Sequence, residues 1–188
     1  MSKLETNTID TLSGTADLQL GSTNNTGKVK IKGANYLVAD IQDYAYNTSV
    51  TVTTESAYID IAGGNTISFT PTSSNDIISL HGYVITRNAE AAGTGIGIMR
   101  GTSSTISSSD TVVARLGKHA LYPRGSGNHF GMVYININDT GLTAGTTYYY
   151  EIYGMANDTS KTVIFQVSVA DGDDRHYLSG THYKYIGA

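Results

Sequence analysis

The chain has 188 residues, a formal net charge of −4 and no cysteine. Without cysteine there are no disulfides, thiolate metal sites or cysteine nucleophiles, and the net negative charge argues against binding to nucleic acid. No stretch approaches the roughly 20 apolar residues of a membrane-spanning helix, and the N-terminal residues lack the apolar core and cleavage site of a signal peptide, so we expect synthesis in a cytosol without standard export.

Short alternating segments separated by glycine make up residues 1–40. They lie at 7–14, 16–21 and 28–33, and each offers only two or three apolar side chains. So few apolar groups do not bury a core, and we expect these strands to pack on something outside the segment. An arm folded back on its own domain is the alternative. We therefore divide the chain into an attachment segment, residues 1–40, and a main domain, residues 41–188.

Residues 34–47 fit a helical turn or a strand equally well, whereas residues 65–87 predict a clear pair of strands. Ile67 and Phe69 alternate with polar residues, a turn-forming stretch follows at 71–75, and a second run is rich in β-branched and aromatic residues. The proline that opens the turn suits the exit from a strand, because it has no N–H to donate to a ladder. We expect the domain to be built around this pair.

Glycine alternates with large apolar residues at 95–100, which weakens a strand unless another backbone or a ring lies against the glycine face. Polar loops are predicted at residues 90–93, 101–110 and 118–128. Alternating runs predict further strands at residues 111–116, 130–138, 146–154, 161–170 and 181–186. About eight strands without a helical period predict an all-β fold, an antiparallel β-sandwich of the jelly-roll type.

Three short stretches carry a resemblance to a known class of protein. They are Ser68 to Ser74 (SFTPTSS), Thr146 to Tyr150 (TTYYY) and Tyr185 to Ala188 (YIGA). Taken in order, they resemble the small β-sandwich domains of phage virion and tail-fibre proteins, over about residues 50–188. Such domains are similar to the trimeric jelly rolls of complement and tumour-necrosis-factor heads. The resemblance implies a homotrimer on a virus particle.

We therefore expect a bacteriophage virion structural protein, made in the host cytoplasm, that forms a homotrimeric short fibre, knob or capsid decoration on the particle surface. Residues 1–40 would form a trimeric stalk or attach to other virion proteins. Only 15% of the residues are charged, which fits a rigid extracellular or virion protein. The alternative is a receptor- or carbohydrate-binding tail-fibre tip for host attachment. Its contact candidates lie in a long loop: His119, Tyr122, Arg124 and His129.

Tyrosine is the most informative excess, with 14 residues. A tyrosine ring buries area at little entropic cost while its hydroxyl finds a polar partner, which suits a subunit contact or a platform for sugars. Subunit packing is our first interpretation and glycan stacking the second. The candidate subunit-interface residues are Tyr148, Tyr150, Tyr183 and Tyr185.

No arrangement of residues in the sequence supports catalysis or metal binding. His176 and His182 are near neighbours, expected to lie across a turn, and the acidic run at 171–174 lacks the spacing of a calcium loop. The one metal site that remains an alternative is a site formed by symmetry-related histidines on the threefold axis of a trimer. Acidic pairs such as Glu90 and Glu151 occur in any sandwich, and no nucleotide loop or nucleophile elbow is present. We expect no enzyme activity, cofactor or metal.

Overall fold

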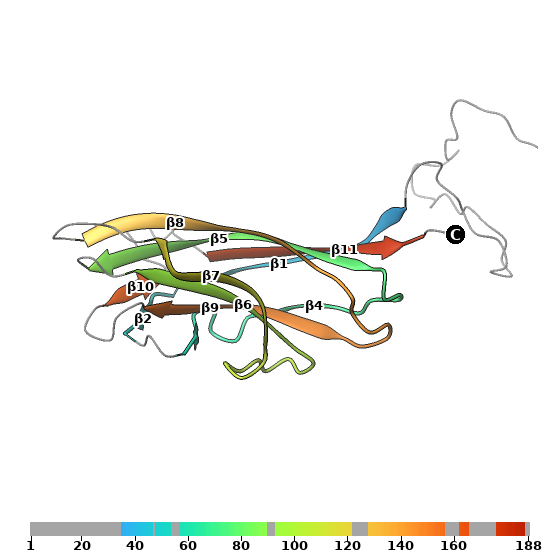
Figure 1. The fold of residues 1–188 in the computed structure, drawn as a ribbon, viewed down its shortest axis with the longest axis horizontal. Coiled ribbons are helices and arrows are strands. Elements are labelled where there is room, and N and C mark those ends of the chain that lie inside the picture. Colours follow the sequence, from blue (N-terminus) through green and yellow to red (C-terminus); the bar gives the residue numbers. More distant parts are fainter. Residues whose placement is uncertain are drawn as a thin grey trace, which may run out of the picture. The chain divides into compact units, whose positions relative to one another are not determined.

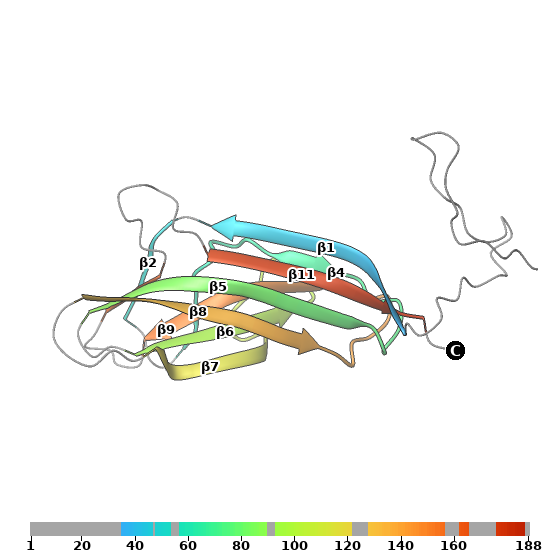
Figure 2. The same cartoon turned by 90° about the horizontal axis from the view of Figure 1, so that it is seen from above.

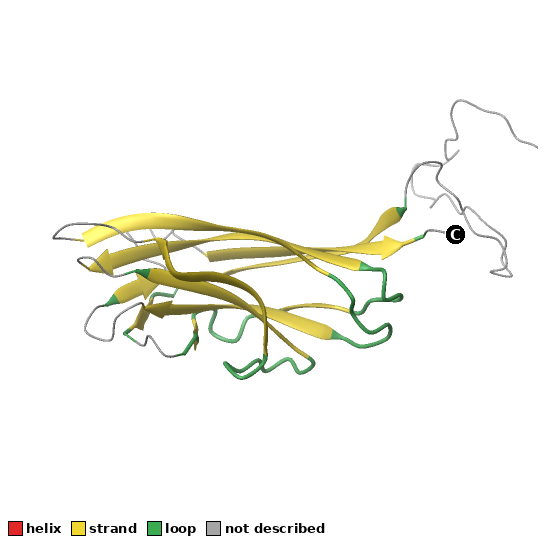
Figure 3. Cartoon of the chain, in the orientation of Figure 1, coloured by secondary structure: helices red, strands yellow, loops and turns green. Residues whose placement is uncertain are grey.

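The computed structural model describes residues 35–46, 48–53, 57–89, 93–121, 128–156, 162–165 and 176–186. All regular structure in these ranges is β-strand (Figure 3), and they hold no helix that is long and apolar enough to cross a membrane. The strands are β1 (Tyr36–Tyr46), β2 (Val50–Val52), β3 (Ile59–Asp60), β4 (Ile67–Phe69), β5 (Ile77–Ala89), β6 (Thr94–Gly101), β7 (Thr111–Leu121), β8 (Asn128–Asp139), β9 (Tyr148–Ala156), β10 (Val163–Phe165) and β11 (His176–Tyr185).

Two antiparallel sheets are stacked face to face (Figure 1). In the first sheet β1, β11, β5 and β8 lie side by side in that order (Figure 2). The short strands β10 and β2 extend this sheet, because β10 pairs with the last part of β5 and β2 pairs with β10. In the second sheet the order is β4, β9, β6 and β7, and β3 also pairs with β9. This interleaved order is that of a jelly roll, which confirms the predicted fold class.

The predicted central pair of strands is present, but its two members belong to different sheets. β4 pairs with β9 in the second sheet, whereas β5 pairs with β8, β11 and β10 in the first. The turn between them therefore carries the chain across the sandwich. Pro71 is buried in this turn, and its carbonyl accepts a hydrogen bond of 2.8 Å from the N–H of Gly145.

The domain boundary predicted at residue 40 falls inside a strand. β1 begins at Tyr36 and pairs with β11 from Tyr36 opposite Tyr185 to Tyr46 opposite His176, with one bulge between Val38 and Asp40. The stretch that fitted a helical turn or a strand is thus a strand, since its ladder with β11 satisfies the backbone groups that face that neighbour. The short segments predicted at 7–33 lie outside the described residues.

The core lies between the sheets, and the second sheet is also covered on its outer face. There Tyr58 and Ile106, from connecting segments, pack with Met99, Tyr153 and Met155. The Tyr58 ring lies against Gly97, where an added Cβ would meet ring atoms at 3.1 to 3.3 Å. A ring from a connecting segment therefore lies against Gly97, one of the alternating glycines. Ile106 also anchors the otherwise exposed loop at 101–110, which was predicted to be wholly at the surface.

Candidate functional site

The outer face of the first sheet is the candidate interaction surface, because nothing in the described chain covers it. Along β8 the outward side chains include Phe130, Met132 and Tyr134, of which Tyr134 is 72% exposed. On β1 the outward Val38 and Ile41 are 56% and 63% exposed. Large apolar side chains gathered on one exposed face mark an interaction site in a soluble protein.

The strand register aligns these side chains into rows across the sheet. Tyr177 of β11 lies opposite Tyr83 of β5, which lies opposite Tyr134 of β8, and the first two rings are stacked with centroids 6.1 Å apart. The next row pairs Ile85 with Met132. We call this half of the face the aromatic band: Tyr83, Tyr177, Tyr134, Ile85, Met132 and Phe130.

A polar row separates the aromatic band from the other end of the face. It runs through Ser179, His81 and Asn136, which are paired across β11, β5 and β8. Beyond it, Tyr183 lies opposite Val38, and Tyr36 lies opposite Tyr185 with ring centroids 5.5 Å apart. The surface therefore combines two apolar ends with hydrogen-bonding groups between them, which is the composition of a specific protein contact.

The structure divides the four predicted interface tyrosines between the two sheets. Tyr183 and Tyr185 are half-buried on β11, on the outer face of the first sheet, where their role in a subunit contact stays a prediction. Tyr148 and Tyr150 are on β9 in the second sheet.

Tyr150 has 0% exposure, and its hydroxyl donates a 2.8 Å hydrogen bond to Asp139. It belongs to the core, which corrects its assignment to a subunit surface. Tyr148 is half-buried, and the Arg100 guanidinium lies 5.1 Å from its ring centroid. Alternating tyrosines have the same sequence pattern whether solvent or a second sheet faces them, so the pattern alone did not separate these cases.

The two ends of the predicted binding loop at 118–128 belong to strands. β7 continues to Leu121 and β8 begins at Asn128, so His119 and His129 are strand residues by their backbone. Tyr122 and Arg124 lie outside the described residues, as do the side chains of the two histidines. Their joint role in binding a receptor or glycan stays a prediction.

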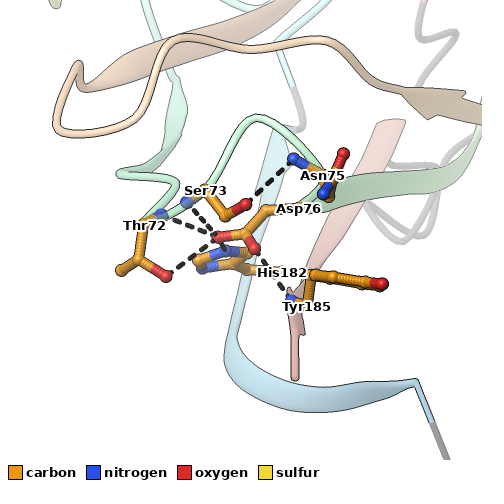
Figure 4. Close-up of polar contacts among 6 residues, drawn as sticks. All are labelled: Thr72, Ser73, Asn75, Asp76, His182 and Tyr185. Atoms are coloured by element: carbon orange, nitrogen blue, oxygen red, sulfur yellow. Dashed lines mark hydrogen bonds and ion pairs between the residues drawn. The ribbon is translucent and has the colours of Figure 1, made fainter. Parts of the chain in front are cut away.

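A buried carboxylate that the sequence did not single out joins the turn before β5 to the end of β11 (Figure 4). Asp76 has 0% exposure. Its Oδ2 accepts hydrogen bonds from the N–H of Thr72 at 2.7 Å, the N–H of Ser73 at 3.2 Å, and Nε2 of His182 at 2.9 Å. Its Oδ1 accepts the N–H of Tyr185 at 2.8 Å. We call these residues the Asp76 cluster: Thr72, Ser73, Asp76, His182 and Tyr185.

Burial raises the pKa of Asp76, but hydrogen bonds from Tyr185, His182 and Thr72 outweigh burial and lower this pKa to about 2. The carboxylate is therefore ionised at neutral pH. The sequence held one local signal for part of this cluster, since an aspartate that follows Thr and Ser by three or four residues caps a turn. Its contacts with His182 and Tyr185 span more than 100 residues and have no local signal.

His176 and His182 were predicted to lie across a turn, and this prediction is wrong. β11 begins at His176 and includes both residues. Both point inward, where Nε2 of His176 donates to the carbonyl of Ile61 at 2.9 Å and His182 bonds to Asp76. Burial lowers the pKa of His176 to about 3, so this ring is neutral. In the described ranges no three His, Asp or Glu side chains are grouped as metal ligands; the acidic run at 171–174 lies outside them.

Glu151 forms a second buried acidic contact, with Asp60. The N–H of Gly64 donates to Oδ2 of Asp60 and to Oε1 of Glu151, both at 3.0 Å. Burial, followed by the hydrogen bond to Asp60, raises the pKa of Glu151 to about 8. With 1% exposure, this carboxyl group does not reach a polysaccharide substrate. Its predicted partner Glu90 lies outside the described residues.

The chain matches no protein-family model and no curated protein. Among solved structures it is similar to those of infectious bursal disease virus. The Gx-strain structure matches 80% of this chain and 38% of that chain, at 10% identity and a TM-score of 0.38. The VP2 subviral particle matches 79% and 42%, at 13% identity and a TM-score of 0.31. This chain thus spans about two fifths of the length of those chains. At these TM-scores the fold assignment rests on the strand order, not on the likeness.

Proposed function

We propose that this protein is a structural protein of a bacteriophage virion, present as a homotrimer on the particle surface in the form of a short fibre, knob or capsid decoration. The observation that carries the proposal is the contrast between the two sheets. The chain covers the outer face of the second sheet with its own Tyr58 and Ile106, but leaves Tyr134 and Ile41 of the first sheet largely in solvent. The uncovered face is the place where a partner stabilises the protein.

A second copy of the chain is the partner that the surface favours. A slot of about 170 Å³ between the sheets is lined by Ile96, Ile98, Ala114, Ile135 and Ile137, with Tyr134 and Asn136 at β8. Within the described residues, β7 and β8 each have one unpaired edge beside this slot. An edge of one copy on the sheet face of the next is a heterologous contact, and such contacts close into a ring when the rotation between copies is one third of a turn. It would also cover the free strand edges.

In this proposal the part of the predicted segment 1–40 that precedes β1 attaches the protein to other virion proteins, and the sandwich projects from the particle. No covalent chemistry is required. Three linked copies raise the effective concentration of each weak contact, so a modest contact per copy holds the assembly in place.

The mass of the full chain in solution tests the trimer. We expect about 60 kDa, three times the 20.0 kDa of one chain. Tyr134→Asp places a charge in the aromatic band, and we expect it to weaken assembly at least tenfold. Thr105→Asp, at an exposed loop position, serves as the matched control and should remain trimeric. A monomeric wild-type protein at micromolar concentration, or an unchanged Tyr134→Asp trimer, would contradict the proposal, provided circular dichroism shows folded β-structure.

The second candidate function is a receptor- or carbohydrate-binding tail-fibre tip that uses His119, Tyr122, Arg124 and His129. It is supported by the position of these residues in the sequence, around the connection from β7 to β8, and by the general role of long connections on rigid scaffolds in binding. Adsorption of the purified trimer to host cells separates the two functions. Loss of adsorption in Tyr122→Ala and Arg124→Ala, with an unchanged trimer mass, would favour the receptor-binding tip.

A further inference from the structure

A hollow of about 400 Å³ lies where the outer face of the first sheet meets two turns. Tyr36 of β1 and Tyr185 of β11 form its aromatic side, and Ile77 of β5 adds an apolar surface. The two turns contribute Ser74, Asn75, Thr140 and Gly141. It is distinct from the aromatic band, from which the polar row separates it. Its volume falls within the range of small-molecule sites, about 300 to 1,000 Å³.

The lining of the hollow selects the chemistry of a ligand. The Tyr36 and Tyr185 rings are arranged edge to face, and Tyr36 is 37% exposed, so aromatic ring surface is offered next to phenol hydroxyls. Hydroxyl and amide groups come from Ser74, Thr140 and Asn75, and among the described residues no charged side chain lines the hollow. A charged ligand would lack a counter-ion here, and a wholly apolar ligand would leave the polar groups without partners.

The Asp76 cluster holds the two sides of this hollow together. Asp76 follows Asn75 directly and binds the backbone N–H of Thr72, Ser73 and Tyr185. Asn75 is also held at its own N–H, by Oγ of Ser73 at 3.1 Å. The spacing between the turn and the Tyr185 backbone is thus set by buried, charge-assisted hydrogen bonds. A site supported in this way is formed before a ligand arrives.

We propose that this hollow binds an uncharged carbohydrate, with the apolar face of a sugar ring against Tyr185 and Tyr36 and its hydroxyls bonded to Asn75, Ser74 and Thr140. A sugar ring has both an apolar face of C–H groups and a rim of hydroxyls, which matches an aromatic side and a polar side in one shallow site. The inference does not depend on the trimer, since all the lining residues belong to one chain.

The test is binding of the full-length protein to an array of neutral oligosaccharides of hexoses and N-acetylhexosamines, with sialylated and sulfated glycans on the same array. We expect neutral glycans to bind in preference to charged ones. Tyr185→Ala and Asn75→Ala should each reduce the binding at least tenfold. Asn138→Ala changes a residue of the same type at an exposed position outside the lining, and should bind like the wild type.

Three outcomes would overturn the proposal: no neutral glycan bound, charged glycans preferred, or binding retained in Asn75→Ala. Asn75→Ala leaves the backbone bonds of the turn in place, so its thermal unfolding midpoint should stay near that of the wild type. This separates loss of the site from loss of the fold. Binding that is lost only in Tyr122→Ala would move the glycan site to the predicted loop at 118–128. The trimer mass is measured on the same samples, so failure of the trimer is recognised independently.

Discussion

Two buried carboxyl groups, Glu151 and Asp76, show opposite responses to similar burial. Burial raises the pKa of Glu151 most, and the neighbouring Asp60, which shares the N–H of Gly64 with it, raises it further, to about 8. Asp76 is surrounded by donors, and its pKa falls to about 2. Burial raises the pKa of both carboxyl groups, and the hydrogen-bond donors around Asp76 reverse that effect, whereas Asp60 adds to it at Glu151.

The shared acidic contact predicts a pH dependence of stability. The folded pKa of Glu151, about 8, is above the ordinary 4.5, so the native state keeps a proton that the unfolded chain releases. Its stabilising effect is complete below about pH 4.5 and is lost as the pH rises to about 8, by up to about 1.4 kcal/mol per pH unit. Glu151→Gln should flatten this decline in thermal unfolding between pH 5 and 8.5. Parallel curves for the two proteins would contradict the prediction.

Asp76→Asn is expected to lower the free energy of unfolding by about 2–4 kcal/mol, because an amide cannot accept the full set of hydrogen bonds and leaves buried donors unpaired. Urea unfolding at pH 7 measures the loss. Asp43→Asn is the matched control, since Asp43 is exposed and accepts a single bond, from the Tyr177 hydroxyl at 3.2 Å. Its effect should stay within about 0.5 kcal/mol. Equal effects of the two substitutions would show that the Asp76 cluster adds little stability.

At the scale of the elements, β11 serves both faces of its sheet. Its inward residues include Leu178 and Gly180, which contribute to the packed interior, and its outward residues include Tyr177 and Tyr183. Gly180 is needed for close packing between the sheets. An added Cβ there would lie 2.5 Å from the Phe69 ring and 2.7 Å from Ile67, both of which are buried on β4.

Gly180→Ala should therefore destabilise the sandwich by about 1–3 kcal/mol through overpacking. The neighbouring Ser179→Ala, on the outer face, is the control and should have little effect. Thermal unfolding of both variants distinguishes them. Equal thermal unfolding midpoints for Gly180→Ala and Ser179→Ala would contradict the prediction, because they would show that the space between β4 and β11 can accept an added methyl group.

For the whole molecule, the remaining question is which part drives the proposed assembly. The outer face of the first sheet and the slot beside β8 belong entirely to the sandwich, whereas the segment of residues 1–40 was predicted to provide a stalk or an attachment. If the sandwich surfaces supply the subunit contact, a chain reduced to residues 35–188 should remain trimeric. Light scattering measures this directly. A monomer of the shortened, folded protein would assign trimer formation to the N-terminal segment.

Sequence alone determined those features that depend on local pattern. Alternation of apolar and polar residues predicted strands and an all-β sandwich, and the turn residues at 71–75 placed the break between β4 and β5. The glycines near Gly97 indicated a close approach, which the Tyr58 ring makes. These properties follow from side-chain period and backbone chemistry over a few residues, so they require no knowledge of distant partners.

The tertiary structure decided which faces are covered and which distant groups meet. A period of two shows that Tyr148 and Tyr150 share a face, but not that a second sheet buries Tyr150 while Tyr134 stays in solvent. The same sequence pattern also does not predict the contact between Asp76 and His182, which are 106 residues apart. The physical reason is that pairing and burial depend on the order of strands in the sheets, and that order comes from contacts far apart in the chain.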